Sequence, residues 1–326
     1  MFTLDTTPGA YRWWYFDAIS DDREWSMVAI FFVGSVFSPA YARRWAEGAS
    51  PLPREHVAVN FAIARRGRPL VWVFSEYGAD RLDLDVDTLR VKDSTMTREA
   101  DRVHLRIDDV RVARGTPVKA KVEVRLVDPP VGDARGIALG SERHRWRCHA
   151  PRTRVDVSVE SLGLAFSGSG YHDENWGDEP PVTSLRSWSW GRVHDGSRSR
   201  VFFDVVPHHG PRTHLVFDSR SGRHEEIRPP LTLRRSPFRW MLAEPKTMDA
   251  GPGDDGAPMI VRASRSLERA PFYHRFQAPF RFARRAPPVT GVAEHVDFVR
   301  FARPVVRGMI GYRLAEPDRG WFGKIP

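Results

Sequence analysis

Hydrophobic positions recur at every second residue over most of this chain. In "HVAVNFAIA" the side chains of Val57, Val59, Phe61 and Ile63 fall on one face. This is the spacing of a β-strand with one buried face. "KVEVRLV" and "RVDVSVE" alternate in the same way. The pattern predicts antiparallel strands.

Two more continuous apolar runs, "WSMVAIFFVG" and "SRVFFDVV", predict strands that are buried on both faces. Clusters of Gly, Pro and Asp separate the runs, which is typical of hairpins. The pattern favours a helix only around residues 39–47. The Pro-, Gly- and Asp-rich stretch 244–258 is expected to be an exposed loop. These features predict an all-β sandwich or barrel.

The length of 326 residues favours two domains. A new series of strands begins with "SLRSWSWGRVHD", directly after "GDEPP". We therefore expect an N-terminal domain over residues 1–183, which carries the candidate site, and a C-terminal domain over residues 184–326.

The charge is strongly basic, with 50 Lys and Arg against 41 Asp and Glu. The Arg residues are scattered, so a solvated basic surface is the first interpretation, and peripheral contact with an anionic membrane is the second. No nucleic-acid-binding pattern occurs, and no nucleic-acid partner is expected. The N-terminus lacks a signal-peptide pattern, and the apolar stretch 27–42 is too short to span a membrane. We expect a cytoplasmic protein that is soluble or peripheral to the inner membrane.

The sequence does not match several known motifs for cofactor binding, nucleophilic catalysis and metal binding. "GSGYHD" lacks the third glycine of a dinucleotide loop, and "GSVFS" is not a nucleophile elbow. His208 and His209 lack metal-ligand spacing, and the single cysteine, Cys148, is interpreted as a buried apolar filler in a reducing compartment. No metal and no cofactor are expected.

The stretch "GSGYHDENWGDEPP" at residues 168–181 is the strongest candidate for chemistry. A hairpin turn at residues 161–163 brings it beside "HRWRCHAP". Because residues two apart in a strand point the same way, His144 and Trp146 can share a space with Tyr171 and Asp173.

Such a set suits proton transfer to an alkene. For Asp173 to act as an acid near neutral pH, its pKa must rise by about three units, which costs on the order of 4 kcal/mol. Burial among aromatic rings, with neighbouring carboxylates such as Asp178 and Glu179, has that effect. The alternative is that Asp173 and Asn175 are turn residues that bond their own backbone.

The chain resembles the carotenoid 1,2-hydratases, also called hydroxyneurosporene synthases. The resemblance rests on "WWYFDAISDD", "AIFFVGSVFSPAYA", "HRWRCHAPRTRVDV", "GSGYHDENWGDEP", "WSWGRV", "APFYHRF" and "EHVDFVRFARP", which extend over nearly the whole chain. It implies two lipocalin-like β-barrel domains packed together. It also implies a cofactor-independent hydratase for an apolar polyene, an acyclic carotenoid or related terpenoid, with no obligate protein partner.

The resemblance further implies roles for four residues. Asp173 protonates the terminal C1=C2 bond, and water captures the tertiary cation at C1. Tyr171 is the tyrosine partner of Asp173, and His144 and Trp146 form the His-x-Trp pair. We expect His144 to relay a proton or position water, and Tyr171 and Trp146 to stabilise the cation.

Five residues are candidates for substrate binding: His172, Asn175, Trp176, Ser35 and Trp190. The tryptophans at positions 13, 14, 188 and 190 are interpreted first as core packing.

His172 and Trp176 depart from the hydratase pattern, and "YHDENWG" also occurs in broader lipocalin-like relatives. Two alternatives therefore stay open. One is a cyclase or pericyclase that acts on a polyene natural product, and the other is a lipophile-binding protein without enzymatic activity.

Overall fold

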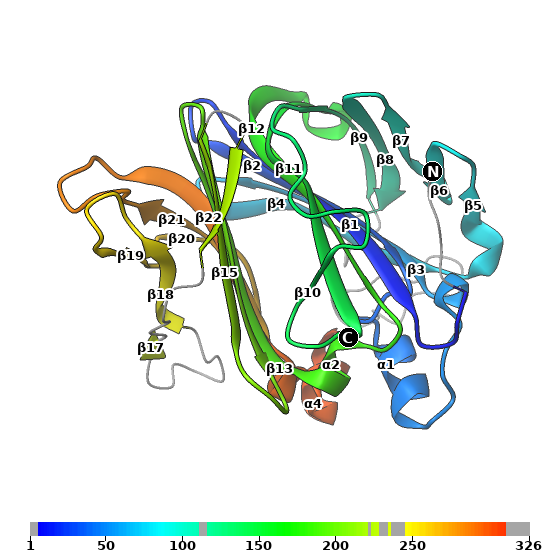
Figure 1. The fold of residues 1–326 in the computed structure, drawn as a ribbon. Coiled ribbons are helices and arrows are strands. Elements are labelled where there is room, and N and C mark those ends of the chain that lie inside the picture. The colour runs from blue at the N-terminus through cyan, green and yellow to red at the C-terminus, as the bar shows by residue number, and fades with distance from the viewer. Residues whose placement is uncertain (1–5, 111–115, 221–222, 228–233, 236–244, 311–326) are drawn as a thin grey trace.

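Two large antiparallel sheets lie against each other in the computed structural model (Figure 1). The structure describes residues 6–110, 116–220, 223–227, 234–235 and 245–310. Strands dominate this part of the chain, and the structure confirms the predicted all-β class.

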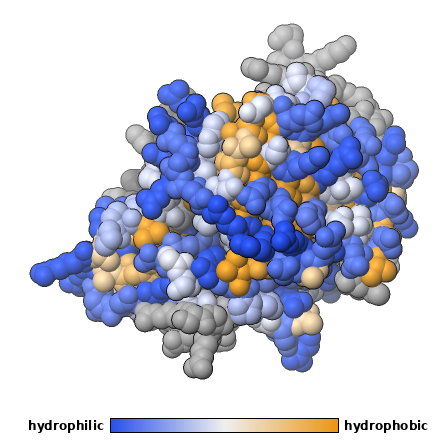
Figure 2. Space-filling view, turned by 90° about the horizontal axis from the view of Figure 1, so that it is seen from above, coloured by the Kyte–Doolittle hydropathy of each residue, from blue (hydrophilic) through white to orange (hydrophobic). Residues whose placement is uncertain are grey.

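The first sheet runs in the order β4-β3-β2-β1-β12-β11-β9-β8-β7-β6-β5, with β10 paired to β11, and curls into a nearly closed barrel. Its strands are β1 Tyr11–Ser20, β2 Trp25–Val33, β3 Val57–Arg65, β4 Arg68–Tyr77, β5 Leu82–Leu84, β6 Thr88–Val91, β7 Ser94–Glu99, β8 Arg102–Val110, β9 Pro117–Leu126, β10 Ile137–Ala138, β11 His144–Val159 and β12 Leu164–Gly177. The predicted face of β3 packs in the core of this barrel: Val57, Val59, Phe61 and Ile63 are all fully buried. From above, apolar side chains come to the surface near the middle of the molecule, within a hydrophilic surround (Figure 2).

The second sheet has the order β16-β15-β14-β13-β22-β21-β20, and a small sheet of β17, β18 and β19 accompanies it. The strands are β13 Leu185–Asp195, β14 Arg198–Pro207, β15 Thr213–Arg220, β16 Arg223–Ile227, β17 Arg234–Arg235, β18 Pro245–Pro252, β19 Pro258–Val261, β20 Arg265–Ala270, β21 Tyr273–Phe280 and β22 Val289–Asp297.

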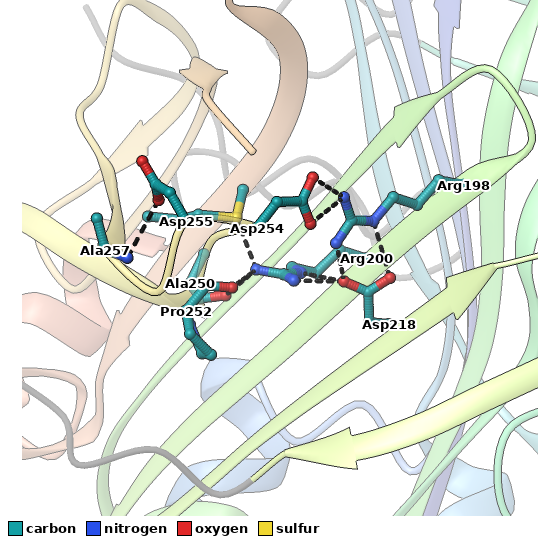
Figure 3. Close-up of polar contacts among 9 residues, drawn as sticks. Arg198, Arg200, Asp218, Ala250, Pro252, Asp254, Asp255 and Ala257 are labelled. Carbon is teal, nitrogen blue, oxygen red and sulfur yellow. Dashed lines mark hydrogen bonds and ion pairs between the residues drawn. The ribbon is translucent and has the colours of Figure 1, made fainter. Parts of the chain in front are cut away.

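A cluster of ion pairs joins the small sheet to the second sheet (Figure 3). Arg198 and Arg200 of β14 both donate to the carboxylate of Asp218 on β15. Arg198 also reaches Asp254 at 2.9 Å, and Arg200 donates to the carbonyl oxygen of Pro252 at 2.6 Å. The turn after β18 is thus held by charged hydrogen bonds.

The expectation of an exposed loop over residues 244–258 is wrong for most of that stretch. Residues 245–252 form β18, in which Met248 and Ala250 are buried in an apolar cluster with Phe202. Exposed residues occur at 254–256, in the turn. Pro, Gly and Asp residues conceal the alternation in the sequence, and residue 244 lies outside the described residues.

Helices occupy little of the described chain. They are α1 Pro39–Ala46, α2 Pro181–Ser184, α3 Phe298–Phe301 and α4 Pro304–Ile310, with 3₁₀ turns at Pro53–Glu55, Ala79–Arg81 and Glu160–Leu162. The structure confirms the predicted helix α1, whose N-cap Ser38 accepts hydrogen bonds from two backbone N–H groups of the first turn. The other helices, each one or two turns long, were not predicted. Over the described residues, no helix combines the length and apolarity that crossing a bilayer requires.

Strands β1 and β12 are adjacent in the first sheet and pack against the second sheet, so side chains on both faces are buried over most of β1 and over residues 170–175 of β12. On β1, Tyr15 and Asp17 face the second sheet, whereas Phe16 packs inside the first barrel. The apolar runs predicted to be buried on both faces are confirmed in β2 and β14.

The glycines of "GSGY" allow β12 to lie close to β1. A Cβ atom on Gly170 would stand 2.1 Å from the carbonyl oxygen of Asp17, and one on Gly168 would stand 2.1 Å from that of Ile19. Both distances are far below van der Waals contact, so only glycine fits these positions.

Candidate active site

An aromatic cavity lies between the two sheets. It holds about 780 Å³ of empty space, counting the part open to solvent, and residues from both sheets line it. Its aromatic and aliphatic lining residues are Trp13, Tyr15, Ile30, Phe32, Phe37, Trp72, Phe74, Trp188, Trp190, Phe203, Phe272, Tyr273 and Ile310. Its polar lining residues are Asn60, Asp173, Asn175, Glu268, Arg275 and Glu294.

Asp173 lies on β12, opposite Tyr15 of β1 and Cys148 of β11, and is 4% exposed. Its Oδ2 accepts hydrogen bonds from the Tyr171 hydroxyl at 2.7 Å and from Trp146 Nε1 at 2.8 Å. Asn175 Nδ2 donates to its Oδ1 at 3.3 Å. Asp173 and Asn175 lie within a strand, so the interpretation of both as turn residues is wrong.

Burial raises the pKa of Asp173 to about 8, although the hydrogen bonds from Tyr171 and Trp146 lower it. The negative charges of Glu294 and Asp17 also raise this pKa. The carboxyl group is therefore mostly neutral at pH 7.

The carboxylates near Asp173 are not those expected from the sequence. Asp178 and Glu179 form ion pairs with Arg143 at 2.8 and 2.6 Å. The charges that act on Asp173 come from Glu294 and Asp17, which lie on other strands and not next to it along the chain.

His144 is buried beside the group around Asp173 rather than within it. Its Nδ1 bonds the Tyr11 hydroxyl, and its ring stacks on Trp188 with the centroids 5.6 Å apart. Burial lowers the pKa of His144 to about 3, so the imidazole is neutral at pH 7. Its Nε2 has no hydrogen-bond partner among the described residues.

Tyr171 and Trp146 contact the carboxyl group of Asp173 without being among the described residues that line the cavity. The ring of Trp146 packs against Phe203 at a centroid distance of 5.4 Å. The ring of Tyr171 packs against Trp190 at 4.9 Å. The two side chains hold Asp173 in place.

Two of the five substrate-binding candidates, Asn175 and Trp190, line the cavity. His172 lies on the opposite face of β12, where its ring stacks on Phe16 at 4.0 Å. Trp176 packs under the guanidinium group of Arg12 at 5.0 Å, and Ser35 is fully buried outside the cavity lining.

The polar residues of the second sheet that line the cavity were not predicted from the sequence. Tyr273 and Arg275 of β21 and Glu294 of β22 line the cavity, and the tryptophans interpreted as packing at positions 13 and 188 line it too. Charged residues within otherwise apolar strands, as in "YHRF" and "VAEHV", are the signal that was available.

The described residues contain no group of three or more His, Cys, Asp or Glu side chains placed to hold a metal ion. Cys148 is buried, as expected, with its Sγ 3.7 Å from the carbonyl oxygen of His172.

The paired antiparallel sheets around an aromatic cavity define a lipocalin-like fold. A structure of a putative AttH from Nitrosomonas europaea matches with a TM-score of 0.61 at 13% identity, over 88% of this chain and 92% of that one. Kievitone hydratase from Nectria haematococca matches with a TM-score of 0.56 at 12% identity, over 88% of each chain. These similarities establish the fold.

The family follows from the sequence comparisons. The model of the carotenoid hydratase CrtC family matches residues 29–321. An acyclic carotenoid 1,2-hydratase from Thiocapsa roseopersicina is 34% identical over 319 residues, which cover 96% of this chain and 75% of the relative. The chain belongs to the CrtC carotenoid hydratase family and is a hydro-lyase.

Proposed function

We propose that this hydratase adds water to the terminal C1=C2 bond of an acyclic carotenoid or related terpenoid, with Asp173 as the proton donor. The observation that carries the proposal is a carboxyl group, with a pKa raised to about 8 by burial, that faces a cavity lined mainly by aromatic rings. The names of the relatives supply the substrate class.

The reaction begins when the Asp173 proton passes to C2 and leaves a tertiary cation at C1. The faces of aromatic rings that line the cavity, such as Trp190 and Tyr15, stabilise this cation. The hydrogen bonds of Tyr171 and Trp146 stabilise the carboxylate that forms on Asp173. Water then attacks C1, and no step of this reaction uses a cofactor.

His144 is proposed as a residue that positions water or the cavity wall. A neutral imidazole with an unpaired Nε2, stacked on Trp188, is suited to form a hydrogen bond with water. It is not suited to donate the first proton, because burial lowers its pKa to about 3.

We propose in addition that helices α3 and α4 contact the cytoplasmic surface of the inner membrane. Val299, Val305 and Met309 are exposed, with Val305 at 67%, and Arg303 is exposed between them. Apolar side chains next to an arginine suit an anionic bilayer surface. Ile310, at the end of α4, lines the cavity, so a polyene in the membrane lies close to the site.

Flotation with vesicles tests the membrane contact. Vesicles with anionic lipid are expected to carry the protein, and Val305→Ser with Arg303→Ser is expected to weaken this binding. Equal flotation of the variant and the unchanged protein contradicts the proposal.

Incubation with neurosporene or lycopene in deuterated water, followed by mass spectrometry, tests the reaction. The expected product has gained one water and carries one carbon-bound deuterium. Rearrangement at constant mass indicates a cyclase instead, and an unchanged ligand indicates a binding protein.

A further inference from the structure

A second carboxyl group lines the cavity together with Asp173. Glu294 lies on β22, next to Trp190 of β13 on one side and Arg275 of β21 on the other. Its side chain is 12% exposed. The ring of Trp190 contacts the ring of Tyr171, which bonds Asp173, so the two carboxyl groups belong to one site.

The hydrogen bonds of Glu294 identify it as a carboxylate. Oε2 accepts from the Tyr273 hydroxyl at 2.6 Å and from Arg275 Nε and Nη2 at 3.3 and 3.2 Å. Oε1 accepts from Trp188 Nε1 at 3.2 Å. All of these partners donate in these bonds, and the guanidinium group of Arg275 supplies a positive charge beside the carboxylate.

The two carboxylate oxygens of Glu294 differ in how many further hydrogen bonds they can accept. Oε2 takes three hydrogen bonds, whereas Oε1 takes one from the described residues. A carboxylate oxygen accepts about two hydrogen bonds, so Oε1 retains a site for a water molecule.

We propose that Glu294 is the general base that accepts a proton from the attacking water. This inference rests on the proposed hydration. It assigns opposite tasks to two carboxyl groups that line one cavity, a neutral acid on the first sheet and a carboxylate on the second.

Hydration of an alkene in the cavity then involves two proton transfers. The Asp173 O–H bond breaks, and the π electrons form the C2–H bond, which leaves the cation at C1. A lone pair of water then forms the C1–O bond while one water O–H bond breaks and its proton passes to Oε1 of Glu294. Transfer of that proton through solvent to Asp173 restores both groups, and the net change is addition of one water.

Labelling with deuterium distinguishes the protonation of the alkene by Asp173 from the capture of the cation by water. In deuterated water Asp173 carries a deuteron and delivers it to C2. If water does not capture the cation, the Asp173 carboxylate takes back either a proton or a deuteron from C2. The carotenoid is then recovered with deuterium but without added water.

Glu294→Gln is therefore expected to lower the rate of hydration by at least about 100-fold, the usual effect of a general base. Deuterium incorporation into the recovered carotenoid is expected to persist. The ratio of exchange to hydration rises by the same factor. The control is Asp128→Asn, which removes a buried carboxylate that pairs with Arg152 at 2.8 Å and is not among the residues described as lining the cavity; it is expected to leave this ratio unchanged.

Glu294→Asp keeps the charge on Arg275 but shortens the side chain by one methylene, and it serves if Glu294→Gln does not fold. It is expected to raise the same ratio, by a smaller factor.

Each failure points to a different claim. If the unchanged protein neither hydrates nor exchanges, the proposed function is wrong. If Asp173→Asn still exchanges, the assignment of the acid is wrong. If both Glu294 variants lower hydration and exchange equally, or lower neither, the role of Glu294 as a base is wrong and the hydratase stands.

Discussion

Asp17 of β1 and Arg192 of β13 form a buried ion pair that joins the two sheets. Both side chains are 1% exposed. Arg192 Nε donates to Asp17 Oδ1 at 3.0 Å, and its Nη2 donates to the same oxygen. The Tyr15 hydroxyl donates to Oδ2 at 3.1 Å. This pair fixes the relative position of the two walls of the cavity.

Arg192→Met is expected to destabilise the protein strongly, by about 3–5 kcal/mol, because Asp17 stays buried without its counter-ion. Urea unfolding followed by tryptophan fluorescence measures the loss. The double variant Asp17→Leu with Arg192→Met is expected to recover much of it, because no isolated charge remains.

The matched control is Arg135→Ala, which removes an exposed ion pair with Asp133. A change of less than about 1 kcal/mol is expected there. Equal losses of stability in Arg192→Met and Arg135→Ala contradict the assigned role of the Asp17–Arg192 pair.

Asp173→Asn is expected to abolish hydration, with a loss of roughly 10²- to 10⁴-fold, while the fold and polyene binding persist. The amide has nearly the shape of the carboxyl group but no acidic proton. Product formation by chromatography and quenching of tryptophan fluorescence by the polyene measure the two effects.

Asp109→Asn is the control for this loss. Burial raises the pKa of Asp109 as well, and its Oδ1 accepts from Ser75 and Tyr77, at 2.8 and 2.9 Å. Asp109 is not among the residues described as lining the cavity. Substantial activity in Asp173→Asn, or an equal loss in Asp109→Asn, excludes Asp173 as the acid.

The pH profile of hydration is expected to fall above about pH 8, because the acid must be protonated and its pKa is about 8. The hydrogen bond from Tyr171 lowers that pKa. Tyr171→Phe is therefore expected to raise the pKa of Asp173 and move the alkaline limb to higher pH. Initial rates between pH 6 and 10 measure this shift of the alkaline limb. A shift of the limb to lower pH in Tyr171→Phe contradicts the prediction.

The free energy of unfolding is also expected to depend on pH, because the pKa of Asp173 differs between the folded and unfolded states. The pKa of Asp173 is about 8 in the folded protein against an ordinary value of 3.8, so the folded state binds the proton more tightly. The contribution of the protonated Asp173 to the stability of the folded state is fully present below pH ~4 and is lost as the pH rises through about 8. Between pH 5 and 8, Asp173→Asn is expected to gain up to about 1.4 kcal/mol per pH unit relative to the unchanged protein. Urea midpoints that run parallel across this range contradict the assignment.

The sequence predicted the strands well because alternation is a local signal. The faces of β3 and β11, the hairpin at Gly163 and the helix α1 all follow from neighbours within a few residues. The hairpin also brought Trp146 and Tyr171 to Asp173, because the register of two adjacent strands is set by their turn.

The rest of the site depends on contacts that no local pattern encodes. Glu294 is more than 100 positions from Asp173, and it reaches the cavity because the second sheet packs on the first. The place of His172 was missed for another reason. It lies between Tyr171 and Asp173 in the sequence, but strand alternation turns it into the first barrel.

The alternation of β12 sets two adjacent acids in opposite states. Asp173 faces the cavity with a pKa of about 8, whereas Glu174 faces the other way, where His149, Arg12 and Arg98 lower its pKa to about 2. A deletion or insertion of one residue on this strand would turn Asp173 into the first barrel and Glu174 toward the cavity, away from the His149, Arg12 and Arg98 side chains that lower its pKa. An odd change in the length of this strand is thus a change of chemistry, and homologues that conserve hydration by this acid are expected to conserve its parity.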